Sequence, residues 1–193
     1  MVIRLTKGRL KVAIAENRAE LGEVAAREVA AYIMALQKEK PEVNIIFASA
    51  PSQNEFLANL LHYDIDWGRI NAFHMDEYIG IDPHAPQSFG QFLRDRIFSK
   101  RNFKSVNYIN PQAADPEAEC ARYAALLRQM PADMVFLGIG ENGHLAFNDP
   151  HVAFFDDPLT VKTVDLDPTC IRQQVNDGCF SSIDQVPTRA YTT

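Results

Sequence analysis

The sequence predicts an α/β fold in which helices cover both faces of a mostly parallel β-sheet. Two patterns favour this class. Strand-like and helix-like segments alternate along most of the chain, and the strand candidates are continuously apolar rather than alternating. Continuous apolar runs are typical of strands that are buried on both faces. At 193 residues the chain has an ordinary single-domain length, so we expect one domain over residues 1–193.

The first predicted elements are a strand and a long helix. Residues 11–15 form a short apolar run, which indicates a strand. Asn17 followed by Glu20 resembles a capping box, and apolar residues then recur at helical spacing to about Lys38. Pro41 prevents the helix from continuing further.

The middle of the chain predicts two buried strands, each followed by a helix. Residues 43–48 are an apolar strand, and Pro51 opens the helix after it. Residues 70–75 form the next strand, and Ser88 caps the helix that follows.

The last clear elements are a helix that starts at Asp115 and a buried strand over residues 134–137. Beyond Pro150 the pattern loosens into short segments separated by prolines. In parallel sheets, ligands bind where the strands end and the helices begin. Functional residues are therefore expected directly after the strands.

Composition excludes several classes of protein. The formal net charge is −6, and no basic stripe of the kind that binds nucleic acid runs along a predicted helix. No apolar stretch approaches the ~18 to 20 residues of a membrane span, and the first residues do not form a signal peptide. Three cysteines without metal-binding spacing, Cys120, Cys170 and Cys179, fit a reducing compartment. We therefore expect a cytoplasmic protein that binds neither nucleic acid nor membrane.

The first candidate loop, ASAPSQ over residues 48–53, follows a buried strand and precedes a helix. Its small residues let a ligand approach the backbone, and the helix start offers free N–H groups to an anion. We expect Ser49, Ser52 and Gln53 to bind a phosphate group. The alternative is an ordinary serine cap without a ligand.

The second candidate loop contains Asp76 and Glu77, two acids directly after an apolar strand. A charge near a buried strand end is costly unless it is hydrogen-bonded or used, so one of these carboxylates is a candidate general base and Glu77 a candidate substrate ligand. A solvated turn is the alternative. His74, one residue inside the strand, fits a buried supporting histidine better than a catalytic one.

The third candidate loop has the spacing G-x-G-x-x-G at Gly138, Gly140 and Gly143, but a proline soon interrupts any following helix. This excludes a dinucleotide-binding helix and favours a tight loop pressed against a ligand, where Gly138 and Gly140 present backbone N–H groups. His144 at its apex can exchange protons near neutral pH, and Asp149 is close enough to orient it. The acids and histidines lack metal-ligand spacing, so we expect no metal.

Two motifs carry a resemblance to a known family: MDEY at 75–78 and GIGENGHLAFNDP at 138–150. With SFGQFL at 88–93 and DQVPTRAYT at 184–192, the chain resembles the glucosamine-6-phosphate deaminase/isomerase family from about Val12 onward. The resemblance implies a modified Rossmann-like α/β fold. It also implies conversion of an amino-sugar 6-phosphate to a ketose 6-phosphate with release of ammonia, without metal or organic cofactor.

The resemblance also implies roles for individual residues. Asp76 matches the base that moves a proton between C1 and C2 through an enediol-type intermediate, and His144 matches the histidine that assists ring opening. Asp149 stands where the family usually has a supporting Glu. Asn142 stands where some members have Asp and others Asn, and we expect it to contact the substrate. Since Asn142 cannot take a proton, a relay would run through Asp149. Arg172 matches the family's phosphate-binding arginine.

The chain departs from the family in two places. Its first loop lacks the family's Gly/Thr-rich character, and the family continues past the position of Thr193 with a further strand, a helix and a phosphate-contacting lysine. We therefore expect residues 1–193 to lack that C-terminal segment. The sequence does not fix which hexosamine or hexose phosphate is used, and it leaves open whether the subunits form a homo-oligomer.

Two other functions compete with this interpretation. A 6-phosphogluconolactonase-like hydrolase would share the G-x-G-x-x-G-H segment, but such enzymes generally continue with a Thr-Ala-Ser-type run and carry Asp-Glu-Arg where this chain has Asp76, Glu77 and Tyr78. A sugar-phosphate-binding homologue without catalysis is the second alternative. The presence of both Asp76 and His144 favours an enzyme.

Overall fold

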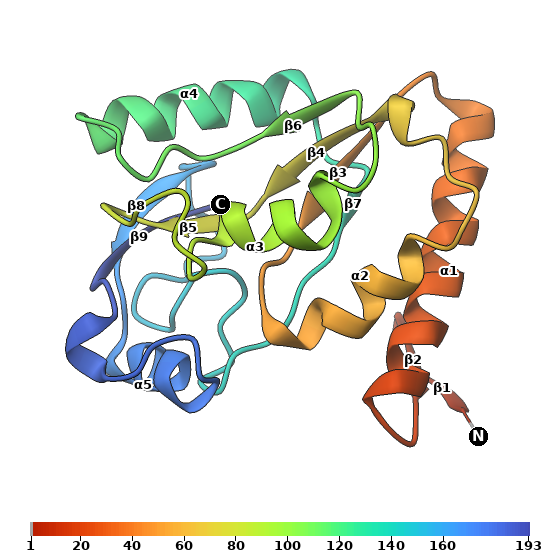
Figure 1. Cartoon of the computed structure of the whole chain (residues 1–193), viewed down its shortest axis with the longest axis horizontal. Coiled ribbons are helices and arrows are strands. Elements are labelled where there is room, and N and C mark those ends of the chain that lie inside the picture. The colour runs from red at the N-terminus through yellow and green to blue at the C-terminus, as the bar shows by residue number, and fades with distance from the viewer. Residues whose placement is uncertain (1) are drawn as a thin grey trace.

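The computed structural model describes residues 2–193 and is built around a four-stranded parallel sheet with the strand order β6-β4-β3-β7 (Figure 1). The strands are β3 (Val43–Phe47), β4 (Ile70–His74), β6 (Ser105–Asn107) and β7 (Met134–Val135). All three pairings between them are parallel, which confirms the predicted sheet type. The strands predicted at 43–48 and 70–75 are confirmed to within one residue, whereas β7 is shorter than the predicted run.

Helices cover both faces of this sheet, as predicted. Because successive strand residues point to opposite faces, Ile45 and Phe47 pack with the helices of one layer, while Ile46 and Phe73 pack with those of the other. Figure 1 shows α4 along one side of the sheet and α1 and α2 on the other. The helices are α1 (Arg18–Glu39), α2 (Asn54–Leu60), α3 (Phe89–Leu93), α4 (Pro116–Gln129) and α5 (Pro168–Asn176).

The helix starts follow the capping signals in the sequence. The Asn17 side chain accepts a hydrogen bond from the Glu20 backbone N–H at 3.0 Å and begins α1. Ser88 accepts the Gln91 N–H at the start of α3, and Asp115 begins α4 in the same way. Each cap satisfies a helical N–H that has no partner within its own helix.

Two antiparallel sheets were not predicted. The strand predicted at 11–15 is present as β2 (Leu10–Ile14), but it pairs with β1 (Ile3–Lys7) in a separate hairpin rather than with the parallel sheet. A second sheet has the order β5-β9-β8, formed by β5 (Asp76–Tyr78), β8 (Lys162–Asp165) and β9 (Arg189–Thr192). This second sheet holds the chain directly after β4 against residues near the C-terminus.

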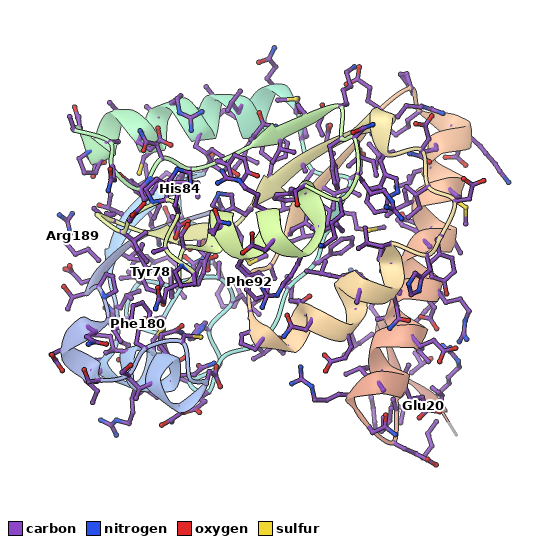
Figure 2. All side chains as sticks on the ribbon, in the orientation of Figure 1. Glu20, Tyr78, His84, Phe92, Phe180 and Arg189 are labelled. Atoms are coloured by element: carbon purple, nitrogen blue, oxygen red, sulfur yellow. The ribbon has the colours of Figure 1, made fainter. Side chains whose placement is uncertain are left out.

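A third core cluster lies between this antiparallel sheet and α5. Tyr78 is fully buried there, and its ring centroid lies 5.2 Å from that of Phe147 and 5.6 Å from that of Phe180. Figure 2 labels Tyr78 and Phe180 in this part of the molecule. This packing fixes the segment around Phe147 against β5. Over residues 2–193, no helix is both long and apolar enough to cross a membrane.

Candidate active site

The three predicted loops meet around one cavity of about 610 Å³ at the carboxyl ends of the parallel strands. One loop follows β3, the second follows β4 and the third follows β7. The structure therefore brings together six of the residues selected from the sequence: Ser49, Ser52, Asp76, Gly138, Gly140 and His144. Asp76 and His144, which lie far apart in the sequence, line the same cavity.

Asp76 is the buried acid of this cavity. Its side chain is only 7% exposed, and its backbone is fixed by pairing with Thr192 of β9. Burial, together with the neighbouring charge of Glu77, raises the pKa of Asp76 well above the ordinary value. A carboxyl with a raised pKa is a stronger base once it is ionised, which suits the removal of a proton from carbon.

His74 supports Asp76 from inside the core. The ring is fully buried, Nε2 accepts the Ile109 N–H at 3.0 Å, and Nδ1–H therefore donates to the Asp76 carbonyl oxygen at 2.9 Å. Burial lowers the pKa of His74 to about 4, so the ring stays neutral. These bonds agree with the interpretation of His74 as a supporting residue.

The expectation that Glu77 binds the substrate is corrected by the structure. The residue is 1% exposed and is not part of the cavity lining. It accepts hydrogen bonds from the Ser88 hydroxyl at 2.8 Å and from the N–H groups of Tyr78, Phe89 and Gly90 at 2.9–3.1 Å. Glu77 therefore anchors the start of α3, and every acceptor position that a sugar would need is used within the protein.

His144 is oriented by a chain of two polar side chains. Asn142 Oδ1 accepts from the His144 backbone N–H at 3.2 Å and from His144 Nδ1 at 2.7 Å, so Nδ1 carries a proton. The Asn142 amide in turn donates to Asp149 Oδ1 at 2.8 Å, and His144 Nδ1 lies 3.2 Å from that same oxygen. Asp149 is fully buried, and Asp149 Oδ2 accepts the Asp167 N–H at 2.8 Å. This arrangement leaves His144 Nε2 as the ring nitrogen available to a ligand. It also corrects the expectation that Asn142 contacts the substrate, because Asn142 does not line the cavity and its side chain bonds His144 and Asp149.

Gly140 provides the space that the imidazole occupies. A Cβ atom at Gly140 would lie 2.1 Å from His144 Cε1 and 2.3 Å from Nε2. The Gly140 N–H donates to the His144 carbonyl oxygen at 3.0 Å, which corrects the expectation that it faces the sugar. Gly143 has a φ of +85°, a conformation that glycine adopts without strain, and it lets the loop turn back.

The serines of the first loop face the cavity, but Gln53 does not. Ser49 is buried, and its hydroxyl oxygen has no hydrogen-bond partner among residues 2–193. A buried hydroxyl without a partner is costly unless a ligand or water completes it. Ser52 also lines the cavity, whereas Gln53 lies outside it and donates to the Ser52 hydroxyl at 3.3 Å.

The expectation that Arg172 binds the phosphate group is also corrected. It is exposed on α5 and does not line the cavity, whereas the next two residues, Gln173 and Gln174, do. Two arginines that sequence reasoning missed, Arg18 and Arg96, are part of the lining instead. The sequence held a signal that could have indicated the position of Arg96, because residues at i, i+4 spacing such as Phe92 and Arg96 share one face of a helix.

Cys170 lies next to His144 and Asp149. Potential metal-ligating atoms of these three residues lie within 4.8 Å of one another. Burial, however, raises the pKa of the Cys170 thiol, and His144 Nδ1 and both Asp149 oxygens bond to protein groups. Asp149 therefore belongs to the network that orients His144, while Cys170 packs in the neighbouring hydrophobic cluster.

Comparisons with known proteins agree on one family. The family profile described as glucosamine-6-phosphate isomerases/6-phosphogluconolactonase matches residues 16–152. A glucosamine-6-phosphate deaminase of Listeria innocua is 40% identical over 152 residues, which are 78% of this chain and 63% of the relative. One from Streptococcus sanguinis is 36% identical over 184 residues, which are 94% of this chain and 73% of the relative. The chain thus spans about two thirds of the length of these relatives.

Solved structures show the same fold. A monomeric glucosamine-6-phosphate deaminase superposes with a TM-score of 0.82 at 30% identity, covering 93% of this chain and 73% of that one. The 6-phosphogluconolactonase of Thermotoga maritima superposes with a TM-score of 0.72 at 19% identity, covering 89% of this chain and 72% of that one. At 19% identity the second likeness concerns the fold alone.

Proposed function

Because the chain belongs to the family of glucosamine-6-phosphate isomerases and 6-phosphogluconolactonases, we propose that it is a glucosamine-6-phosphate deaminase. The proposed reaction converts glucosamine 6-phosphate and water to fructose 6-phosphate and ammonia. One observation carries the proposal most directly: Asp76 and an oriented His144 line one cavity of about 610 Å³, large enough for a sugar phosphate.

Asp76 is the proposed base. After the sugar ring opens, its carboxylate takes the proton from C2 of the aldehyde and a proton is returned to C1, through an enediol-type intermediate. Water then attacks the C2 imine, and ammonia leaves. The raised pKa of Asp76 strengthens the carboxylate as a proton acceptor.

His144 is the proposed group for ring opening. Its Nε2 would exchange a proton with the ring oxygen or the anomeric hydroxyl of the sugar. The hydrogen bond between Nδ1 and Asn142 holds the imidazole in place. Asp149 supports this arrangement through Asn142 and at 3.2 Å from His144 Nδ1. Its negative charge would stabilise an imidazolium during proton transfer. These steps are proton transfers and hydration, so the proposal involves no metal or organic cofactor.

Ser49, Ser52 and Gly138 are the proposed contacts for the hydroxyl and phosphate groups of the substrate. The unpartnered Ser49 hydroxyl supports this part of the proposal, since a ligand oxygen would complete its hydrogen bonding. The relatives named as deaminases support the choice of an amino-sugar phosphate. We place the reaction in the cytoplasm, which suits the three free cysteines. Homo-oligomer formation stays a prediction, and the neighbour at 30% identity is described as monomeric.

The proposal is tested by comparing two reactions of the purified chain. We expect ammonia and fructose 6-phosphate in equal amounts from glucosamine 6-phosphate, and no acid release from 6-phosphogluconolactone above the spontaneous rate. Lactone hydrolysis without ammonia release would instead identify a hydrolase. A rise in Tm with sugar phosphate but no turnover would identify a binding protein.

A further inference from the structure

Arg96 is a cavity-lining cation that is held in place by two neighbours. It lies in the turn Arg94–Phe98 after α3. Its guanidinium carbon stacks 3.7 Å from the centroid of the Phe92 ring, and its Nε donates to Asn54 Oδ1 at 2.5 Å. Figure 2 shows Phe92 on α3, facing the space between α3 and α2. Stacking and hydrogen bonding together limit the rotamers of Arg96, so little side-chain entropy is left to lose on binding.

The Arg96 guanidinium forms no salt bridge within the described chain, and the nearby negative charge of Asp95 only partly offsets its desolvation. No carboxylate of residues 2–193 lies within ion-pair distance of it, whereas Arg18, the other arginine of the lining, forms a two-pronged pair with Glu55 at 2.8–2.9 Å. Partial burial lowers the pKa of Arg96, which reflects the cost of removing a guanidinium from water. An anionic ligand in the cavity would offset that cost.

The position of Arg96 places it beside the serine loop. Asn54, which holds the Arg96 Nε, follows directly after the ASAPSQ segment of residues 48–53. Ser49 and Ser52 of that segment line the same cavity, and the Ser49 hydroxyl is unpartnered. A planar guanidinium and hydroxyl donors around one space match the geometry of a phosphate group.

We propose that Arg96 binds the phosphate group of the sugar-phosphate substrate, with Asn54 as its positioning residue. The inference rests on the proposed function for the identity of the substrate. It assigns to Arg96 the contact that the sequence resemblance assigned to Arg172.

The test compares Arg96→Gln and Arg96→Lys with Arg94→Gln. Arg94 is a matched control, because it lies in the same turn, stacks 4.9 Å from the Tyr108 ring and bonds Gln91, but does not line the cavity. We measure KM and kcat for glucosamine 6-phosphate, and the affinity for inorganic phosphate by calorimetry. Loss of a charged hydrogen bond predicts a KM about 10- to 100-fold higher in Arg96→Gln, with kcat within about threefold of wild type.

We expect a similar loss of phosphate affinity in Arg96→Gln, an intermediate loss in Arg96→Lys and wild-type values in Arg94→Gln. An unchanged KM and phosphate affinity in Arg96→Gln would overturn the inference. Equal losses in Gln and Lys variants, with a lowered Tm in both, would also overturn it by showing a structural role. Should the wild type bind phosphate through Arg96 but release no ammonia, the deaminase proposal would fail and the Arg96 inference would stand.

Discussion

Replacing Gly140 with alanine should move the imidazole of His144 without changing any chemical group of the site. The new Cβ would lie 2.1 Å from His144 Cε1, and an ordinary contact requires at least 3.4 Å. The ring therefore has to shift by about 1.3 Å, which is incompatible with the 2.7 Å bond between Nδ1 and Asn142.

A displacement of about 1 Å in a catalytic group can cost about 100-fold in rate. We therefore expect kcat/KM for ammonia release to fall by about 100-fold or more in Gly140→Ala. Gly140 has a negative φ, so alanine adds no backbone strain, and the Tm should fall by only a few degrees. Ammonia release and thermal unfolding measure the two effects separately.

Gly68→Ala serves as the control. The nearest atom to its new Cβ would be Asp66 Oδ1 at 3.4 Å, an ordinary contact, and Gly68 is not part of the cavity lining. It should keep wild-type kcat/KM. If Gly140→Ala retained more than half of the wild-type kcat/KM, the imidazole would not need the position described here, and the argument from Gly140 would be refuted.

Three further predictions concern stability. Glu77→Ala leaves the Ser88 hydroxyl and three backbone N–H groups without an acceptor. It should cost about 3 kcal/mol or more, and lower the Tm by about 6–12 °C for a chain of this length; an unchanged Tm would contradict this. Gly22→Ala places a Cβ 2.5 Å from Glu55 Cβ at the crossing of α1 and α2, so calorimetry should show a loss of about 1–3 kcal/mol, and full stability would contradict the close packing. Asp76 has a raised pKa in the folded state, so the native protein binds more protons than the unfolded chain above the ordinary value of 3.8, and stability falls as pH rises. Asp76→Asn should therefore raise the Tm at pH 8 but not near pH 3. Equal Tm shifts at the two pH values would show that burying the ionised carboxylate does not destabilise the folded protein.

The parallel sheet and the three loops could be predicted because their signals are local. Apolar runs marked β3 and β4, and Asn17, Ser88 and Asp115 marked helix starts by side-chain chemistry alone. The antiparallel sheet could not be predicted in the same way. Its strands are short and partly polar, and β5 pairs with β9 across most of the chain length, which no local pattern reports.

The errors at the site have the same origin. Asp76 and Glu77 are adjacent in sequence, but successive side chains of a strand point to opposite faces, so one enters the cavity and the other caps α3. On α5, a one-residue difference decides whether a side chain faces the cavity, as Gln173 does, or solvent, as Arg172 does. These orientations depend on tertiary packing, which local sequence patterns do not reveal.

The proposed catalytic role of Asp76 is tested most directly by the kinetics and substrate affinity of Asp76→Asn. Loss of a general base predicts that kcat for ammonia release falls by at least about 100-fold, while the Kd for glucosamine 6-phosphate stays close to that of the wild type. Undiminished turnover in this variant would contradict the assignment of Asp76 as the group that moves the proton between C2 and C1.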